Sequence, residues 1–443
     1  MAKPKFRVGV LTGGGDTSAL NATLWGITKA AENLGGEVIG FRRGWAGILY
    51  PGKKYFVEDK GERKPLDDIT GEYIFLHTND TSPTPGTYVD PEQGGSIILS
   101  SRTNLAKILG SLEDVARRLN ELSIDYFLPI GGDDTTTVTW RVKREGVLGN
   151  IRIMAVPKTI DNDVGRIGPE NVFAGFEGMT NIWDPGFPSA VRNARDYSNY
   201  TYSTAYSHER VLWNEAMGRK AGFLALGMAH TGLADMVLIP EVQINIDEVM
   251  EQVLRVYKEK GFFYGVVSEG IVDEATGEEI GAHPDFVDQF GHAKLGGAAK
   301  VMAELSKLYF KKKGTHAPYH TGLVPEYVYR GGPPTKLDMR KARSLGYHAL
   351  ATLAENSSAN GHMAVLLWDG NTVRQATMPL EEAVALDTKG KIIPRTVPVD
   401  SEHPEKGFYD PKTKTLTELG RRYVELLQVV PITFTPYAGE VFK

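Results

Sequence analysis

The chain has 443 residues, of which 41% are hydrophobic, and a formal net charge of −5. This composition is typical of a soluble globular protein with a large core, and the length suggests about three domains. The acidic balance argues against a nucleic-acid partner, and the absence of cysteine excludes disulfides and thiolate metal clusters. No apolar run approaches the roughly 20 residues of a membrane span, and residues 1–15 show no signal-peptide pattern, so we expect a cytoplasmic enzyme without a membrane partner.

Short apolar segments alternate with helical patterns in the first part of the chain. FRVGVL (6–11) predicts a strand, residues 19–35 an amphipathic helix, and EVIGF (37–41) the next strand. Further strands are predicted over SIIL (96–99), DYFLPI (125–130) and IRIMAV (151–156), with a helix over 131–146. Alternating strands and helices require crossover connections, which predicts a mostly parallel sheet covered on both faces.

A second alternating region begins near residue 208. It is predicted to hold a strand running into a helix over 208–230, a strand over 235–241, a helix from Ile246 and a buried strand over 262–270. One apolar stripe of that helix is assigned to the core: Val249, Met250, Val253, Leu254 and Tyr257. Residues 51–94, residues 164–186 and the region beyond about 370, with one helix over 415–427, are interpreted as additions to this plan.

The polar cluster TGGGD (12–16) follows the first predicted strand, and ligands gather at such strand ends in parallel sheets. Its glycines let backbone N–H groups approach an anion, and the following helix offers a positive N-terminal dipole. The alternative is a tight strand-to-helix turn in which Asp16 or Ser18 caps the helix. The cluster by itself leaves both readings open.

The cluster GGDDT (131–135) repeats this arrangement after another strand and adds a pair of carboxylates. Such a pair can hold Mg²⁺, which takes carboxylates together with phosphate oxygens. Helix capping needs only one aspartate, so the second calls for another explanation.

The cluster PKTIDND (157–163) places a cation, a hydroxyl and two carboxylates at the end of a third strand. A general base held beside a lysine suits phosphoryl transfer to a hydroxyl. Asp-Asn-Asp is also a common turn composition. The occurrence of all three clusters at strand ends favours a phosphate site.

The motifs GVLTGGGD, GGSIILSSRTN, GGDDT, PKTIDND, SHERV, MGRKAG, SEG and YRGG occur in the order found in the phosphofructokinase family. The resemblance implies an α/β fold of two Rossmann-like three-layer α/β/α domains with mostly parallel sheets and the active site in the cleft between them. We expect a phosphate-donor domain over 1–163, a sugar-phosphate-binding domain over 164–330, and a segment over 331–443 that completes both. DQFGHAKLGG (288–297) and the C-terminal segment resemble the longer members that use pyrophosphate.

Two positions bear on the phosphoryl donor. Members that use ATP typically have glycine after GGD and before TIDND, whereas this chain, with Asp134 and Lys158, resembles members that use inorganic pyrophosphate. A carboxylate about 4 Å from an α-phosphate would repel it by about 4 kcal/mol at an effective dielectric of about 20. Asp134 is thus expected to exclude ATP, and Lys158 to attract the compact pyrophosphate.

The resemblance implies a role for each matching residue. Asp161 would take the proton from the 1-hydroxyl of fructose 6-phosphate, Lys158, Thr159 and Arg219 would stabilise the transferring phosphoryl group, and Asp133 would bind Mg²⁺. The donor would be held by Gly13, Gly14, Arg102, Asp134 and Thr135. The sugar phosphate would be held by Asp163, Met217, Gly218, Glu269, Tyr327 and Arg330, with Arg210 from a neighbouring subunit of a homodimer or homotetramer.

The chain departs from the family pattern at two places. Residues 17–21 read TSALN where a Pro-Gly pair is usual. Thr321 occupies a position, upstream of YRGG, where the family usually has a basic residue that binds the sugar phosphate. Three alternatives to a pyrophosphate-dependent 6-phosphofructokinase stay open. They are ATP as donor, a larger acceptor such as sedoheptulose 7-phosphate, and a non-catalytic sugar-phosphate sensor.

Overall fold

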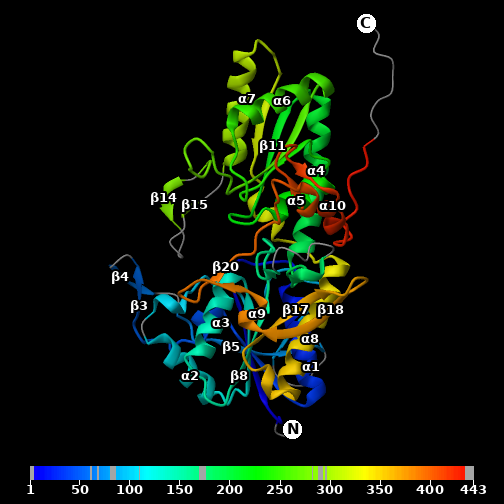
Figure 1. Ribbon diagram of the computed structural model, residues 1–443. Coiled ribbons are helices and arrows are strands. Elements are labelled where there is room, and N and C mark those ends of the chain that lie inside the picture. Colours follow the sequence, from blue (N-terminus) through cyan, green and yellow to red (C-terminus); the bar gives the residue numbers. More distant parts are fainter. Residues whose placement is uncertain are drawn as a thin grey trace.

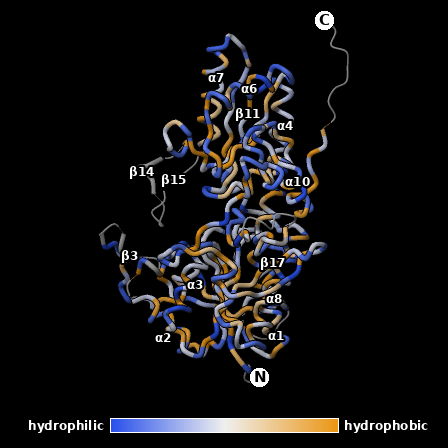
Figure 2. Tube along the Cα trace, in the orientation of Figure 1, coloured by the Kyte–Doolittle hydropathy of each residue, from blue (hydrophilic) through white to orange (hydrophobic). Residues whose placement is uncertain are grey.

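The computed structural model describes residues 4–59, 62–66, 69–79, 86–108, 110–168, 176–281, 283–287, 293–294 and 297–434. The chain forms two α/β lobes, each built on its own sheet (Figure 1). Apolar stretches recur in both lobes (Figure 2), as expected for two cores. No helix within the described ranges is long and apolar enough to cross a membrane.

The larger sheet has eight strands in the order β18-β17-β8-β7-β1-β2-β5-β6. These are β1 (Arg7–Gly13), β2 (Glu37–Phe41), β5 (Tyr73–His77), β6 (Thr87–Tyr88), β7 (Tyr126–Gly131), β8 (Arg152–Pro157), β17 (His362–Trp368) and β18 (Val373–Pro379). Neighbouring strands are parallel except at the pairs β2–β5 and β17–β18. The parallel strands β1, β7 and β8 therefore end at one edge, where all three polar clusters lie.

Helices cover both faces of this sheet because its strands are apolar on both sides. The helices of this lobe are α1 (Leu20–Leu34), α2 (Ser111–Glu121), α3 (Asp133–Arg144) and α8 (Lys336–Glu355). Leu128 packs in one core with residues of α1 and α8, whereas its neighbour Phe127 packs in another with residues of α2 and α3. The alternation of side chains along β7 thus produces three layers.

The smaller sheet has four parallel strands in the order β12-β13-β11-β16. They are β11 (Val211–Ala216), β12 (Met236–Leu238), β13 (Phe263–Ser268) and β16 (His320–Leu323). The helices of this lobe are α4 (Phe187–Ser207), α5 (Phe223–Thr231), α6 (Ile246–Lys260) and α7 (Ala298–Lys312). The predicted stripe on α6 is buried at Val249, Met250, Val253 and Leu254, and Tyr257 packs against the same core. The predicted α/β class with mostly parallel sheets is confirmed.

The segment after Arg330 contributes to both lobes. Helix α8 and strands β17 and β18 belong to the larger sheet's lobe, whereas α10 (Glu418–Glu425) contacts α5 (Figure 1). The chain therefore returns to both lobes after residue 330, although the exact limits of the three predicted domains stay a prediction.

The remaining elements are short. The strands are β3 (Tyr55–Asp59), β4 (Glu62–Leu66), β9 (Arg166–Ile167), β10 (Met179–Thr180), β14 (His283–Val287), β15 (Ala293–Lys294), β19 (Ala385–Leu386), β20 (Ile392–Ile393), β21 (Tyr409–Asp410) and β22 (Thr415–Leu416). The helices are α9 (Leu380–Ala383) and the 3-10 turns η1 (Gly44–Gly47), η2 (Leu105–Lys107), η3 (Phe176–Gly178), η4 (Glu326–Tyr329), η5 (Ser357–Ala359) and η6 (Pro404–Lys406). Of the motif over 288–297, only residues 293–294 and 297 lie within the described ranges.

Two sequence-based predictions are wrong. Residues 96–99 form a turn rather than a strand, because Leu99 adopts a positive φ of 59° and its N–H donates to Ser96 O (3.0 Å). The N–H of Ile97 donates to the side chain of Asn21 (2.8 Å), so its partner is not a neighbouring strand. Residues 51–94 are not wholly an addition, because β5 and β6 extend the larger sheet.

Candidate active site

A cavity of about 200 Å³ lies between the two lobes. Its lining residues come from the ends of β1, β7 and β8, from the segment between β6 and η2, from the loop after β11 and from two later segments. They are Gly14, Gly15, Arg102, Gly132, Asp133, Asp134, Thr135, Lys158, Thr159, Asp161, Asp163, Arg219, Lys220, Ala221, Arg330, Lys391 and Pro394. Six basic residues and four carboxylates thus surround one cavity, which suits a phosphorylated ligand with a divalent cation.

The glycine loop at the end of β1 needs its glycines for close packing. A Cβ on Gly13 would lie 2.3 Å from Thr135 Oγ1, and a Cβ on Gly15 would lie 2.5 Å from Arg330 Nη1. Gly14 has a positive φ of 82°. The loop therefore lies against α3 on one side and Arg330 on the other, and side chains on the loop would fill the space of an anion.

The turn over residues 96–99 places the following residues, 100–102, against the glycine loop. Gly14 N–H donates to Ser101 O (2.9 Å), and Ser100 Oγ donates to Gly14 O (2.6 Å). Arg102 follows directly and lines the cavity. The residues predicted to hold the donor are thereby brought together, although the turn differs from the predicted strand.

Helix α3 begins at the cavity with two carboxylates. Gly132 precedes it in an extended conformation, and the N–H of Asp134 donates to Asp133 Oδ1 (2.8 Å). Both aspartates lie in the first turn, where the helix dipole favours negative charge, and both line the cavity. Asp133 therefore accepts a hydrogen bond from the helix N-terminus, and both carboxylates also face the ligand space.

Lys158 lies beneath the glycine loop with only 2% of its surface exposed. Its Nζ donates to Gly13 O (2.8 Å) and to Gly15 O. Burial and the neighbouring Arg330 lower the pKa of Lys158 to about 7. The ammonium group thus fixes the loop as well as carrying charge, and this structural role was not predicted from the sequence.

The loop after β8 carries the acidic pair Asp161 and Asp163. Thr159 Oγ1 accepts a hydrogen bond from the N–H of Asp161 (3.0 Å), and Asn162 between the aspartates has a positive φ of 58°. Burial and the repulsion of Asp133 raise the pKa of both carboxyls, and that of Asp163 lies well above its ordinary value. Asparagine tolerates the left-handed conformation that turns both carboxylates into the cavity.

A buried network from the C-terminal segment holds this loop. Arg395, 4% exposed, donates from Nε (3.0 Å) and Nη2 (2.6 Å) to Asn162 O. Asn162 Nδ2 donates to the Tyr423 hydroxyl (2.6 Å), which itself donates to Ile182 O (2.8 Å). Asp184 pairs with Arg395 at 3.8 Å. The loop that carries Asp161 and Asp163 is therefore fixed by residues more than 200 positions later in the chain.

The smaller sheet supplies the opposite wall. Arg219 lines the cavity and forms an ion pair with Glu279 (3.0 Å). Gly218 has a positive φ of 125°, and its N–H donates to Glu269 Oε1 (3.0 Å). Burial and the charge of Asp161 raise the pKa of Glu269 to about 7. Met217, Gly218 and Glu269 do not line the cavity, and Met217 packs against the core.

Arg330 and Tyr327 belong to the segment that crosses between the lobes. Arg330 Nη1 donates to Asp16 O (3.3 Å), so the residue expected at the sugar phosphate lies beside the donor loop. Tyr327 is 71% exposed and does not line the cavity. Tyr329 anchors the segment, because its buried hydroxyl donates to Glu215 O (2.6 Å).

Arg210 lies away from this cavity. It directly precedes β11, whereas Met217 directly follows it, so roughly 20 Å of strand separates Arg210 from the cavity end. Its guanidinium stacks on the ring of Tyr319 at 4.7 Å. Thr321 lies in the adjacent strand opposite Leu212. Within one chain, the structure therefore does not bring Arg210 to the other predicted site residues.

The cavity residues fit a magnesium ion. Asp161 Oδ1 and Asp163 Oδ1 are buried without a hydrogen-bond partner, and Asp133 lines the same cavity. Among the described residues no group of three or more His, Cys, Asp or Glu forms a metal cage. Mg²⁺ commonly takes one or two carboxylates together with substrate phosphates, which matches this arrangement.

Several residues that line the cavity were not predicted from the sequence. Lys220 and Ala221 follow Arg219 directly, whereas Lys391 and Pro394 come from the C-terminal segment. The stretch DTKGK (387–391) has the composition of a turn, but nothing in the sequence indicates that this turn reaches the cavity.

Comparison with known proteins agrees with this geometry. A profile of the family described as Phosphofructokinase matches residues 7–353. The chain belongs to the phosphofructokinase family, and its members are kinases that transfer a phosphoryl group. It is 33% identical to a pyrophosphate--fructose 6-phosphate 1-phosphotransferase of Amycolatopsis mediterranei, over 79% of this chain and 88% of that protein. It is 29% identical to an ATP-dependent 6-phosphofructokinase of Mycobacterium leprae, over 86% of this chain and 94% of that protein.

Solved structures support the fold. A pyrophosphate-dependent phosphofructokinase from Marinobacter aquaeolei superposes with a TM-score of 0.69 at 20% identity, covering 98% of this chain and 93% of that one. Its counterpart from Nitrosospira multiformis gives a TM-score of 0.70 at 20% identity, covering 98% and 94%. The two-lobed architecture is therefore that of this family.

Proposed function

We propose that this protein is a cytoplasmic enzyme that transfers a phosphoryl group from inorganic pyrophosphate to the 1-hydroxyl of fructose 6-phosphate. The products are fructose 1,6-bisphosphate and phosphate, and the reaction is reversible. The observation that carries the choice of donor is Asp134, a second carboxylate in the first turn of α3 that lines the cavity.

The charge of Asp134 disfavours a nucleotide donor. An α-phosphate about 4 Å from this carboxylate would be repelled by about 4 kcal/mol at an effective dielectric of about 20, roughly a thousandfold in affinity. Pyrophosphate lacks the phosphate group that would occupy this position, so Asp134 disfavours it less than it disfavours ATP. Relatives named as pyrophosphate-dependent, at 31–33% identity, support the same choice.

The catalytic step follows from the groups around the cavity. Asp161 accepts the proton of the sugar 1-hydroxyl, and its raised pKa suits a general base because it lies closer to the operating pH. Lys158 and Arg219 neutralise charge on the transferring phosphoryl group, and Thr159 stabilises it through its hydroxyl, where positioning and electrostatics do most of the work. Asp133 would hold Mg²⁺, which shields the charge of the phosphates when bound.

ATP is the nearest alternative donor. A groove of about 610 Å³ opens beside the cavity, and Asp134 lines both. Relatives named as ATP-dependent are 29–32% identical to this chain. The groove offers space for a nucleoside, and Asp134 is then the residue that decides between the two donors.

Donor competition tests the proposal. Purified protein with Mg²⁺ and fructose 6-phosphate is supplied with pyrophosphate or with ATP, and fructose 1,6-bisphosphate is measured. Turnover with pyrophosphate alone is expected, and Asp134→Gly is expected to gain ATP use. Turnover of the wild type with ATP alone would refute the assignment of the donor. Activity with neither would favour another acceptor, tested with sedoheptulose 7-phosphate, or a non-catalytic sensor.

A further inference from the structure

The hairpin formed by β19 and β20 docks on helix α3. Ile392 is 1% exposed, and its N–H donates to Thr137 Oγ1 (3.1 Å). Gly390 lies so close to Trp140 that a Cβ there would be 2.1 Å from the ring atom Cζ3. These contacts fix the hairpin relative to the helix that carries Asp133 and Asp134.

The turn of this hairpin is itself fixed. Asp387 Oδ1 accepts hydrogen bonds from the N–H groups of Lys389 (2.8 Å) and Lys391 (2.9 Å). The N–H of Asp387 donates to Lys391 O (2.8 Å), and that of Gly390 donates to Asp387 O (2.9 Å). The backbone at both lysines is therefore held in place whatever their side chains do.

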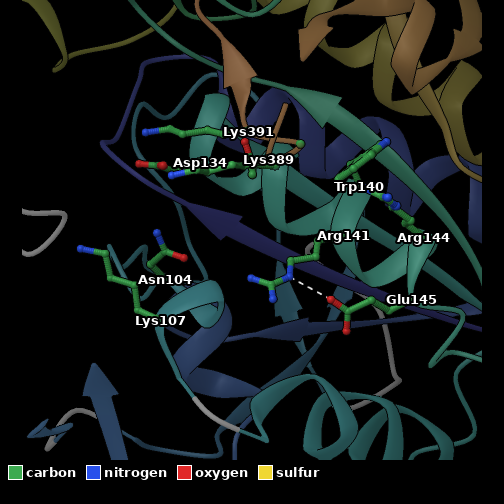
Figure 3. A pocket seen from close by; sticks show the side chains of 11 residues that line it. Asn104, Lys107, Asp134, Trp140, Arg141, Arg144, Glu145, Lys389 and Lys391 are labelled. Atoms are coloured by element: carbon green, nitrogen blue, oxygen red, sulfur yellow. Dashed lines mark hydrogen bonds and ion pairs between the residues drawn. The ribbon is translucent and has the colours of Figure 1, made fainter. Parts of the chain in front are cut away.

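Only one of the two lysines lines the cavity as well as the groove. Lys391 lines both the 200 Å³ cavity and the 610 Å³ groove, whereas Lys389 lines the groove alone. Figure 3 shows both lysines close to Asp134 on one side of the groove, with Asn104 and Lys107 on the opposite side. Asp161 lines the cavity but not the groove. Lys391 and Asp134 therefore mark the end of the cavity that opens to the groove.

Two other basic residues of the cavity already donate hydrogen bonds to backbone carbonyls. Lys158 is buried, and its Nζ already donates to Gly13 O and Gly15 O, which leaves one of its three N–H bonds. Arg330 donates to Asp16 O. Lys391 is only partly buried, and the contacts that fix its turn are made by the backbone, so its ammonium group can reach a bound anion.

We infer that Lys391 binds the leaving group, which is the phosphate of pyrophosphate that is not transferred. Hairpin β19–β20 is then an element that recognises the donor. The inference rests on the proposed function. The transferred phosphoryl group lies beside Asp161, so the other phosphate extends toward the groove, where its negative charge meets Asp134 and Lys391. The lysine offsets the repulsion that Asp134 would otherwise exert on pyrophosphate itself.

The test compares Lys391→Ala with Lys389→Ala, a control with the same charge change in the same turn. Lys391→Ala is expected to raise KM for pyrophosphate about 10- to 100-fold, which corresponds to one lost charge-assisted hydrogen bond. KM for fructose 6-phosphate stays unchanged, and Lys391→Arg recovers most of the affinity. Lys389→Ala behaves as wild type. Circular dichroism checks that all variants are folded.

Binding of imidodiphosphate, an unreactive analogue of pyrophosphate, is measured by calorimetry as a readout independent of turnover. Wild-type binding that Lys391→Ala weakens and Lys389→Ala does not supports the inference. Equal binding by the two alanine variants would overturn the role of Lys391 and leave the pyrophosphate assignment intact. A wild type that neither binds the analogue nor turns over pyrophosphate would overturn the proposed function, and this inference with it.

Discussion

Asp161 is the group on which the proposed chemistry depends most directly. Its Oδ1 is buried without a hydrogen-bond partner, so the carboxylate is held for a ligand rather than for the fold. Asp161→Asn keeps the shape of the side chain but removes the base. We expect kcat to fall about 10²- to 10⁴-fold with little change in binding of fructose 6-phosphate. Steady-state kinetics and calorimetry check this result, and unchanged turnover would show that another group acts as the base.

Glu269, which is predicted to bind the sugar phosphate, is expected to give the site a pH dependence. Its pKa is raised to about 7, so the carboxylate becomes protonated as the pH falls below about 7. A neutral carboxyl accepts hydrogen bonds from sugar hydroxyls more weakly than a carboxylate does. We expect KM for fructose 6-phosphate to rise below this pH, and Glu269→Gln to remove that dependence. KM measured between about pH 6 and 8 checks the prediction, which fails if the variant keeps the wild-type profile.

At the scale of elements, the C-terminal segment braces the catalytic loop through Tyr423. Tyr423→Phe leaves Asn162 Nδ2 buried without its acceptor and is expected to cost about 1–3 kcal/mol of stability and to lower kcat. Tyr409→Phe is the matched control, because Tyr409 is a buried tyrosine of the same segment whose hydroxyl donates to Val237 O (2.9 Å).

Chemical denaturation and steady-state kinetics separate the two effects. Both variants are expected to lose stability, but only Tyr423→Phe is expected to lose turnover, since only its hydroxyl contacts the loop that carries Asp161. Equal kcat values in the two variants would show that the brace contributes to stability alone.

At the scale of the whole molecule, Arg210 raises the question of a second subunit. It lies at the far end of β11 from the cavity, so a role in binding sugar phosphate requires that it act on a neighbouring chain. Asp161→Asn and Arg210→Ala are each expected to be nearly inactive. In a symmetric dimer, a co-refolded equal mixture is expected to regain about a quarter of wild-type activity, because each mixed dimer holds one intact site. Activity no higher than the average of the two variants would contradict a shared site.

The sequence by itself determined the elements that form from local periodicity. Strands β1, β2, β7 and β8 and helices α1, α3 and α6 follow from alternating apolar segments and glycine turns. Because parallel strands end at one edge, the sequence also indicated that the clusters at 12–16, 131–135 and 157–163 would meet. The turn at 96–99 was mistaken for a strand, since its apolar run resembles one, whereas the N–H of Ile97 donates to the side chain of Asn21 and Leu99 has a positive φ, which the local pattern does not reveal.

Only the tertiary structure decided how distant residues complete the site. It buries Lys158 under the glycine loop, sets Arg395 and Tyr423 behind Asn162, and brings Lys391 to the cavity. These contacts join segments more than 100 residues apart, and they depend on how two lobes and a returning C-terminal segment pack together. Local patterns fix which elements form, whereas burial and charge in the assembled fold fix what each side chain can do.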